Sequence, residues 1–176
     1  MKKILFALIA LVISLPMMAQ DYVITTDEAH ADGSRSIMCE LVNTRSFTDK
    51  QVFHVGLSSL IINVDGEKRI KKYLVLKVVT LAQHKIPEGS LLLVKNVDGE
   101  VLELRSINEG DAMVRKTEWI GNTPIAQYYA SVFYTVTEED LEFLKKGIVK
   151  FRQETNYGKH EKEYKKEKEI KKVTDV

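Results

Sequence analysis

The pentapeptide Asn-Val-Asp-Gly-Glu occurs twice in this chain, at residues 63–67 and 96–100, each time between two apolar runs. Asp-Gly is a strong turn signal, because glycine accepts a positive φ and aspartate caps its own turn. Neither copy has the alternating oxygen ligands and the distant glutamate of a calcium-binding loop. The repeat therefore predicts two antiparallel hairpins. They pair 51–63 with 69–81, and 91–96 with 101–106.

The rest of the chain carries further strand signals and one clear helix signal. Strand-like segments lie at 36–43, 127–136 and 148–155. A strand sends alternate side chains to opposite faces. The core face that we predict for 127–136 carries Tyr128, Ala130, Val132, Tyr134 and Val136. Thr137 and Asp140 have the spacing of a capping box, which predicts a short helix over 138–146.

These patterns set the expected fold class. We expect a mainly β protein with one or two short helices, built as an antiparallel β-sandwich or a curled sheet. A chain of 176 residues is long enough to bury one hydrophobic core. We therefore predict a single β-rich domain over 20–158. Residues 107–126 are punctuated by Gly and Asn and are expected to form an irregular connection.

The first residues have the three parts of a secretory signal peptide. Lys2 and Lys3 are basic, Ile4–Leu15 is an apolar run, and Ala19 offers a small residue before a cut. The apolar run is shorter than the roughly 20 residues of a membrane-spanning helix, which argues against an uncleaved anchor. We predict a signal peptide over 1–19 and a periplasmic or secreted protein. Membrane contact is then expected from the signal peptide only.

The C-terminal segment 159–176 is highly charged. Its stretch from Lys159 to Lys172 contains seven Lys and four Glu. Glu161 and Lys165 have the spacing of a favourable helical ion pair. We expect a charged helix or a solvated tail here, able to make a weak contact with an anionic surface. Over the whole chain, Lys+Arg 26 against Asp+Glu 25 gives no basic excess, which argues against nucleic acid as a partner.

Residues with reactive side chains do not form a recognisable catalytic motif. Cys39 is the chain's single cysteine, and His54 is its best candidate base. A cysteine nucleophile needs a base within hydrogen-bond reach, so this pair is the one enzyme hypothesis that we name. The alternative for Cys39 is a buried thiol that packs as a small apolar side chain. Ser58 and Ser59 are interpreted as small residues of a strand.

The sequence also gives only weak signs of a binding site. Four potential metal ligands are close together in a polar loop, but no second ligand cluster accompanies them, so an ordinary solvated loop is favoured. These ligands are Asp27, Glu28, His30 and Asp32. The basic run at 68–72 could contact an anion or an acidic polysaccharide, but it also suits the exposed end of a hairpin strand. Trp119 is expected to pack on the core, and the alternative is a ligand contact from an exposed loop.

Three features together indicate a resemblance. They are the Lys2-Lys3 leader that ends in Met-Met-Ala-Gln, the paired Asp-Gly hairpins, and the run at 136–152. In these features the chain resembles small exported β-rich proteins of unknown function from Gram-negative bacteria. The resemblance implies a location and a fold class, and it implies no catalytic, metal or cofactor site. We expect a non-enzymatic binding or structural protein of the cell envelope, with an envelope protein or a polysaccharide as partner. The competing hypothesis is a small periplasmic hydrolase with an unrecognised site.

Overall fold

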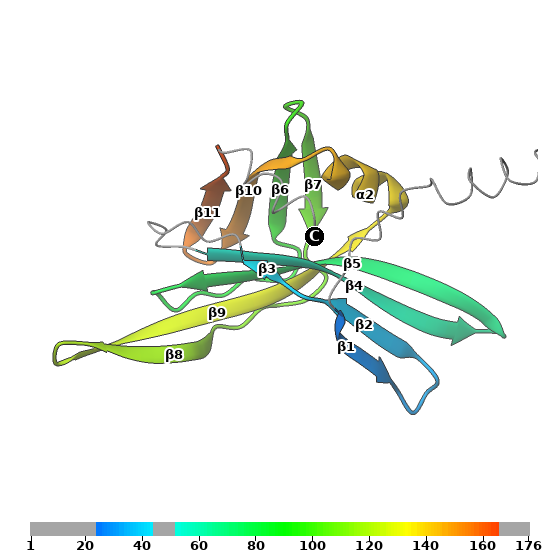
Figure 1. The fold of residues 1–176 in the computed structure, drawn as a ribbon, viewed down its shortest axis with the longest axis horizontal. Coiled ribbons are helices and arrows are strands. Elements are labelled where there is room, and N and C mark those ends of the chain that lie inside the picture. Colours follow the sequence, from blue (N-terminus) through cyan, green and yellow to red (C-terminus); the bar gives the residue numbers. More distant parts are fainter. Residues whose placement is uncertain (1–23, 44–51, 166–176) are drawn as a thin grey trace, which may run out of the picture.

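The computed structural model describes residues 24–43 and 52–165. The predicted signal peptide at 1–19 and the end of the predicted tail, 166–176, lie outside the described residues. Antiparallel strands make up most of the described chain, and one short helix accompanies them. This confirms the predicted mainly β fold class, with a strongly curled sheet and a second sheet (Figure 1).

The large sheet contains seven strands. They are β1 (Ile24–Ala29), β2 (Arg35–Cys39), β3 (Val42–Asn43), β4 (Val52–Val64), β5 (Glu67–Thr80), β8 (Met113–Ile120) and β9 (Thr123–Val136). Their order is β1-β2-β4-β5-β9-β8, and β3 also pairs with β4. The edges of the large sheet among the described residues are therefore β1 and β8.

The small sheet contains four strands and stands over the middle of the large sheet (Figure 1). They are β6 (Leu91–Asn96), β7 (Val101–Arg105), β10 (Ile148–Thr155) and β11 (Gly158–Glu163), in the order β11-β10-β6-β7. Helix α2 (Glu138–Lys145) connects β9 to β10. A bridge between Ser106 and Tyr134 brings the end of β7 beside β9. The two sheets thus close on one another.

Both predicted Asp-Gly hairpins are confirmed, but the two copies of the pentapeptide make different turns. In the β4–β5 hairpin, Asp65 (φ 53°) and Gly66 (φ 83°) form a two-residue turn between Val64 and Glu67. Two successive positive φ angles are the conformation that Asp-Gly favours in tight hairpins. In the β6–β7 hairpin only Gly99 has a positive φ, and the loop is longer.

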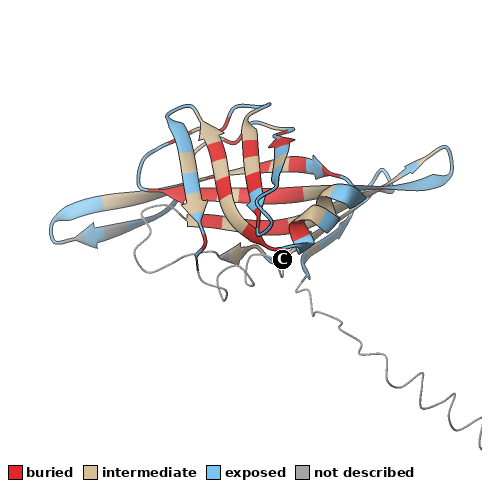
Figure 2. Cartoon of the chain, turned by 90° about the horizontal axis from the view of Figure 1, so that it is seen from above, coloured by how far each residue is buried: buried red, intermediate tan, exposed pale blue. Residues whose placement is uncertain are grey.

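The core lies between the two sheets, where the buried residues gather in Figure 2. The face predicted for 127–136 is confirmed, because Ala130, Val132, Tyr134 and Val136 are buried. Phe53 of the large sheet stacks on Phe151 of the small sheet, with ring centroids 6.2 Å apart. One continuous cluster of apolar side chains therefore holds both sheets.

The helix begins where its capping residues predict. The Asp140 backbone N–H donates to the Thr137 hydroxyl at 3.2 Å, and the Thr137 N–H donates to an Asp140 carboxylate oxygen at 2.8 Å. This reciprocal pair satisfies two of the amide groups that a helix N-terminus leaves without partners. Leu144 is the buried residue of the helix and faces the core.

The predictions for two segments of the chain are wrong. Residues 107–126 were expected to be irregular, but they contain β8 and the start of β9, joined at Gly121 with φ 62°. A bulge between Val114 and Lys116 interrupts the alternation of apolar and polar side chains in β8. The two-residue period of a strand is therefore not visible in the sequence. In addition, Trp119 is exposed and does not pack on the core.

The second wrong prediction concerns the start of the charged tail. Residues 158–163 form the edge strand β11 rather than a helix, and they pair with β10. Glu161 contacts Lys150 at 2.8 Å and also Arg152 on that strand, instead of Lys165. Tyr164 is buried against Phe151. Cross-strand ion pairs and one buried ring thus override the helical charge spacing.

Candidate functional site

The β8–β9 hairpin extends beyond the body of the protein and forms an arm (Figure 1). Its outer part is coloured as exposed or half-buried in Figure 2. The small sheet covers the middle of the large sheet, where Ala130 and Val132 of β9 are buried. The arm is the part of the same two strands that the small sheet does not cover.

Strand register shows which side chains of the arm share the core face. Val114 lies opposite Tyr128, Thr117 opposite Ala126, and Trp119 opposite Pro124. Tyr128, Ala126 and Pro124 alternate along β9 with the parity of the buried Ala130, so all of these residues belong to the core face of the sheet. The bulge near residue 115 keeps Val114 on the same face as Trp119, although five positions separate them. The core face thus continues outward as an apolar ledge.

The apolar ledge is open to solvent at its outer strand. Trp119 is 69% exposed and Val114 is 60% exposed, and Met113 on the opposite face is also exposed. Single exposed apolar residues are ordinary, but a tryptophan and a valine on one face of a projecting strand form a patch. Tryptophan is also among the residues that contribute most to binding interfaces.

The backbone of β8 offers a second kind of contact. Within the described residues, β8 pairs only with β9 and ends the strand order of the large sheet. An edge strand presents N–H and C=O groups that another extended chain can pair with. Backbone pairing supplies affinity in this mode of recognition, and side chains at alternate positions supply specificity. The arm combines both features, so we regard it as the candidate functional site.

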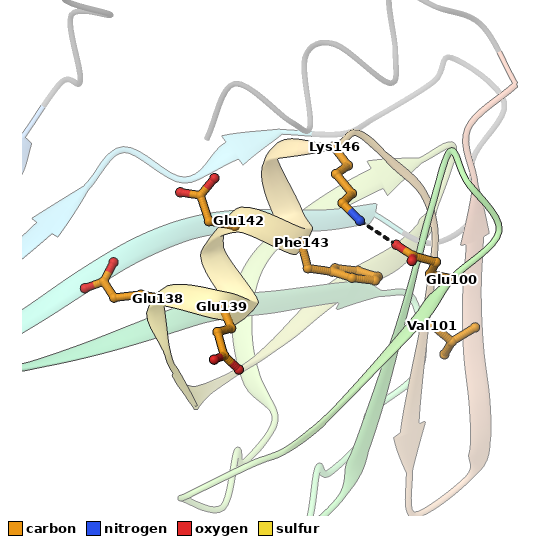
Figure 3. Close-up of a pocket in the computed structure, with 7 residues that line it drawn as sticks. All are labelled: Glu100, Val101, Glu138, Glu139, Glu142, Phe143 and Lys146. Carbon is orange, nitrogen blue, oxygen red and sulfur yellow. Dashed lines mark hydrogen bonds and ion pairs between the residues drawn. The ribbon is translucent and has the colours of Figure 1, made fainter.

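A groove beside helix α2 is a second surface of interest (Figure 3). It has a volume of about 590 Å³ and is lined by Glu100, Val101, Glu138, Glu139, Glu142, Phe143 and Lys146. Lys146 contacts Glu100 at 2.8 Å, which lowers the pKa of that carboxyl group. Glu138 and Glu142 are paired with Lys72 and Lys145. Most of its carboxylates are therefore already paired with lysines of the chain.

Two histidines, the buried His84 and the half-buried His160, meet where the small sheet lies beside the loop after β5. The rings of His84 and His160 are 5.6 Å apart at 60°. The Nδ1 atom of His84 is 3.0 Å from the Thr80 hydroxyl, whereas Nε2 of His84 and both ring nitrogens of His160 are buried without a hydrogen bond to described residues. Burial lowers the pKa of His84, and burial followed by the nearby His84 lowers the pKa of His160. Burial thus disfavours the charged form of both rings.

A pocket of about 500 Å³ opens above His84. Lys85 lies at its rim, contacts Glu109, and is 3.3 Å from Asp111, and the Glu109 contact is the main cause that raises the pKa of Lys85. The Asn156 side chain accepts from the Lys85 backbone N–H at 2.7 Å. These contacts tie the loop after β5 to the β10–β11 turn. The pocket is therefore a junction between loops, and His84 is one of the residues that line it.

The structure separates the predicted thiol–imidazole pair. Met38 lies opposite Ser58, so the two share a face of the sheet. His54 has the parity of Ser58 on β4, whereas Cys39 follows Met38 and points to the other face. The sheet therefore stands between Cys39 and His54. Cys39 is half-buried, and burial raises the pKa of its thiol, which disfavours the reactive thiolate.

The polar residues near the N-terminal hairpin contact their own strands. Asp27 is paired with Arg35 across β1 and β2. Asp32 accepts from the Ser34 backbone N–H at 2.9 Å, and the His30 ring contacts the Ser36 hydroxyl. No three His, Cys, Asp or Glu side chains converge on a metal-binding point within residues 24–43 and 52–165. These contacts account for the turn between β1 and β2 as an ordinary polar hairpin.

The basic run at 68–72 forms the outer half of β5, as expected for the exposed end of a hairpin strand. Residues 68–71 are exposed, and Lys72 is half-buried and paired with Glu138 at 2.6 Å. Ser58 is a sheet residue whose hydroxyl donates to the Ile37 carbonyl oxygen at 3.0 Å. None of these groups lies on the apolar ledge of the arm.

Sequence patterns missed both the arm and the histidine pair. Gly121-Asn122 between two β-prone segments is a hairpin signal, and it could have identified β8 and β9 as partners. His84 and His160 are far apart in sequence and meet only because β11 pairs with β10. No short motif marks such a pair. Within the described part of the chain, no helix is both long and apolar enough to span a membrane.

Comparison of the chain with models of known protein families, with curated proteins and with solved structures gave no significant match.

Proposed function

We propose that the protein is an exported, non-enzymatic binding or structural protein of the bacterial envelope that pairs with an extended polypeptide strand along β8. The observation that carries this proposal is the edge strand β8, whose Val114 and Trp119 are exposed on one face. Export rests on the signal-peptide pattern of residues 1–19. The alternative is a small periplasmic hydrolase with an unrecognised site. The one candidate pair named for it, Cys39 and His54, lies on opposite faces of the sheet.

Strand addition suits the physical chemistry of the arm. A new strand would pair with backbone groups of β8 and would cover the indole of Trp119 and the side chain of Val114 at once. Burying apolar surface contributes about 25 cal/mol per Å², so covering these two side chains is favourable by a few kcal/mol. A polysaccharide would match the edge less well, because it offers no regular row of amide groups.

Replacing Val114 and Trp119 together with serine is expected to weaken partner binding at least about 30-fold, because truncating an interface tryptophan typically costs 2 kcal/mol or more. The full chain is expressed with its own leader in a Gram-negative host. The processed protein, which should begin at Gln20, is then crosslinked in the intact envelope. The yield of crosslinked protein–protein adducts is measured for wild type and variant.

Ile70→Ser is the matched control, because Ile70 is also an exposed apolar strand residue, at 59%, but lies on the other projecting hairpin. The control should give the wild-type adduct yield. Equal yields for wild type and the double serine variant, with both chains folded, would rule out the arm as the binding surface.

A further inference from the structure

Strand β8 can pair with the same strand of a second copy about a two-fold axis, and this pairing points to a partner for the arm. Building on the strand addition proposed above, we propose that a second copy of this chain pairs with β8, antiparallel and about a two-fold axis at Thr117. A two-fold interface must be self-complementary, so that residue i contacts j and j contacts i. The sequence and register of β8 satisfy this condition.

Register and bulge together place Val114 opposite Trp119 of the other copy. From an axis at Thr117, Lys116 lies opposite residue 118, and the next pair inward on the core face is Val114 with Trp119. Trp119 is two positions from Thr117 and Val114 is three, and the extra residue at the bulge, Arg115, accounts for the difference. Both copies carry the same bulge, so the arrangement is symmetric.

The pairs formed in this register are favourable ones. An aromatic ring opposite a β-branched side chain occurs twice, and Thr117 meets Thr117 on the axis. Cross-strand pairs of these kinds stabilise an antiparallel pair of strands relative to alanine pairs.

Neighbouring registers are less favourable. An axis at Lys116 would set Lys116 opposite Lys116, and like charges directly opposite are destabilising. It would also move Val114 away from Trp119, so both apolar side chains would stay exposed. A slip of one residue turns a strand's side chains to the other face. The self-complementary register at Thr117 is therefore the one that the chain's own residues favour.

The test uses the fact that Cys39 is the chain's single cysteine. In a Cys39→Ser background, Thr117→Cys places one thiol on the proposed axis. Residues directly opposite in antiparallel strands have Cα atoms about 4.5–5.5 Å apart, within the range that a disulfide needs. Mild oxidation of the purified full chain should give a covalent dimer on denaturing gels. Because Thr117 is exposed, the substitution should leave the fold intact.

Thr123→Cys in the same background is the matched control. Thr123 is also an exposed threonine of the β8–β9 hairpin, but it lies on β9, away from the proposed axis. Crosslinking of Thr117→Cys should exceed that of Thr123→Cys by roughly tenfold, because only the former pair meets the required Cα separation. Adding Trp119→Ser should remove this excess.

Equal crosslinking at the two positions, or none at Thr117, would overturn the second-copy proposal. That failure is distinguishable from failure of the proposed function. If Thr117→Cys gives no dimer but the double serine variant still loses its envelope adducts, strand addition stands and its partner is a different polypeptide. If adducts are also unchanged, both proposals fail.

Discussion

Phe151→Ala is expected to lower the free energy of unfolding by about 3–5 kcal/mol, the usual cost of removing a fully buried phenyl ring. The Phe151 ring has no exposed surface, stacks on Phe53 of the large sheet and meets Tyr164 edge-on. Its removal leaves a cavity where the two sheets and the chain after β11 come together. Denaturant unfolding, followed by circular dichroism and by tryptophan fluorescence, measures the change.

Tyr157→Ala is the control for this prediction. Tyr157 lies in the turn between β10 and β11 and is 74% exposed, so its loss should change stability by no more than about 0.5 kcal/mol. A loss of less than about 1 kcal/mol for Phe151→Ala would mean that the small sheet does not share one core with the large sheet. Two separate unfolding transitions in the wild type would lead to the same conclusion.

Stability should also fall as the pH is lowered through about 6.5. Burial holds the folded-state pKa of His84 and His160 below their ordinary value of 6.5. The unfolded chain therefore takes up protons before the folded chain does. Each neutral ring contributes to the free energy of unfolding. This contribution is fully present above pH 6.5 and is lost as the pH falls toward the lower folded-state pKa. The limiting slope is about 1.4 kcal/mol per pH unit for each histidine.

The histidine pair can be separated from other titrating groups. The carboxyl groups of Asp27, Glu100 and Glu161 have pKa values lowered below 3.8–4.5, so they lose their contribution at lower pH. Free energies of unfolding are therefore compared between pH 7.5 and pH 5.5. His160→Phe should reduce this dependence, because a phenyl ring can occupy the half-buried site without binding a proton while His84 remains.

His30→Gln provides the comparison for this pH dependence. His30 is exposed in the β1–β2 turn, a different part of the fold, so this variant serves as the comparison for the loss of one histidine. If His160→Phe shows the same slope as wild type while remaining folded, the histidine pair does not control stability in this range. If the slope is reduced equally in both variants, the assignment to His160 is wrong.

Local sequence signals predicted a large part of the fold. The Asp-Gly turns, the alternation of 127–136 and the capping box at Thr137 and Asp140 are each determined by residues close together in sequence. Turn chemistry and side-chain period act over a few residues, which is why these elements were found. The pairing of distant strands, such as β5 with β9, was not readable from such signals.

The candidate site was missed for a physical reason that the structure makes clear. The bulge near Arg115 breaks the two-residue period of β8, so the strand looked like an irregular connection. Trp119 was then expected to pack on the core, because apolar loop residues usually do. Whether the small sheet covers the arm depends on where β6, β7, β10 and β11 lie in space, and no pattern within residues 107–126 carries that information.

The charged tail shows the same limit. Alternating Lys and Glu from residue 159 fit both a solvated helix and an edge strand with cross-strand ion pairs. Tertiary contacts decide between them: Tyr164 is buried against Phe151, and Glu161 meets the cations of β10. Intrinsic propensity is a weak guide when such contacts exist.

Hydrogen exchange at the backbone amides of β8 tests the central claim most directly, because strand addition must protect amides that an open edge exposes. The purified full chain is followed by mass spectrometry over a dilution series, with β1, the other edge of the large sheet, as internal reference. Strand pairing predicts that residues 113–120 exchange slowly when concentrated and faster on dilution, while residues 24–29 stay unchanged. Exchange in 113–120 that is equally fast at every concentration, and also with the envelope fraction added, would contradict strand addition at β8.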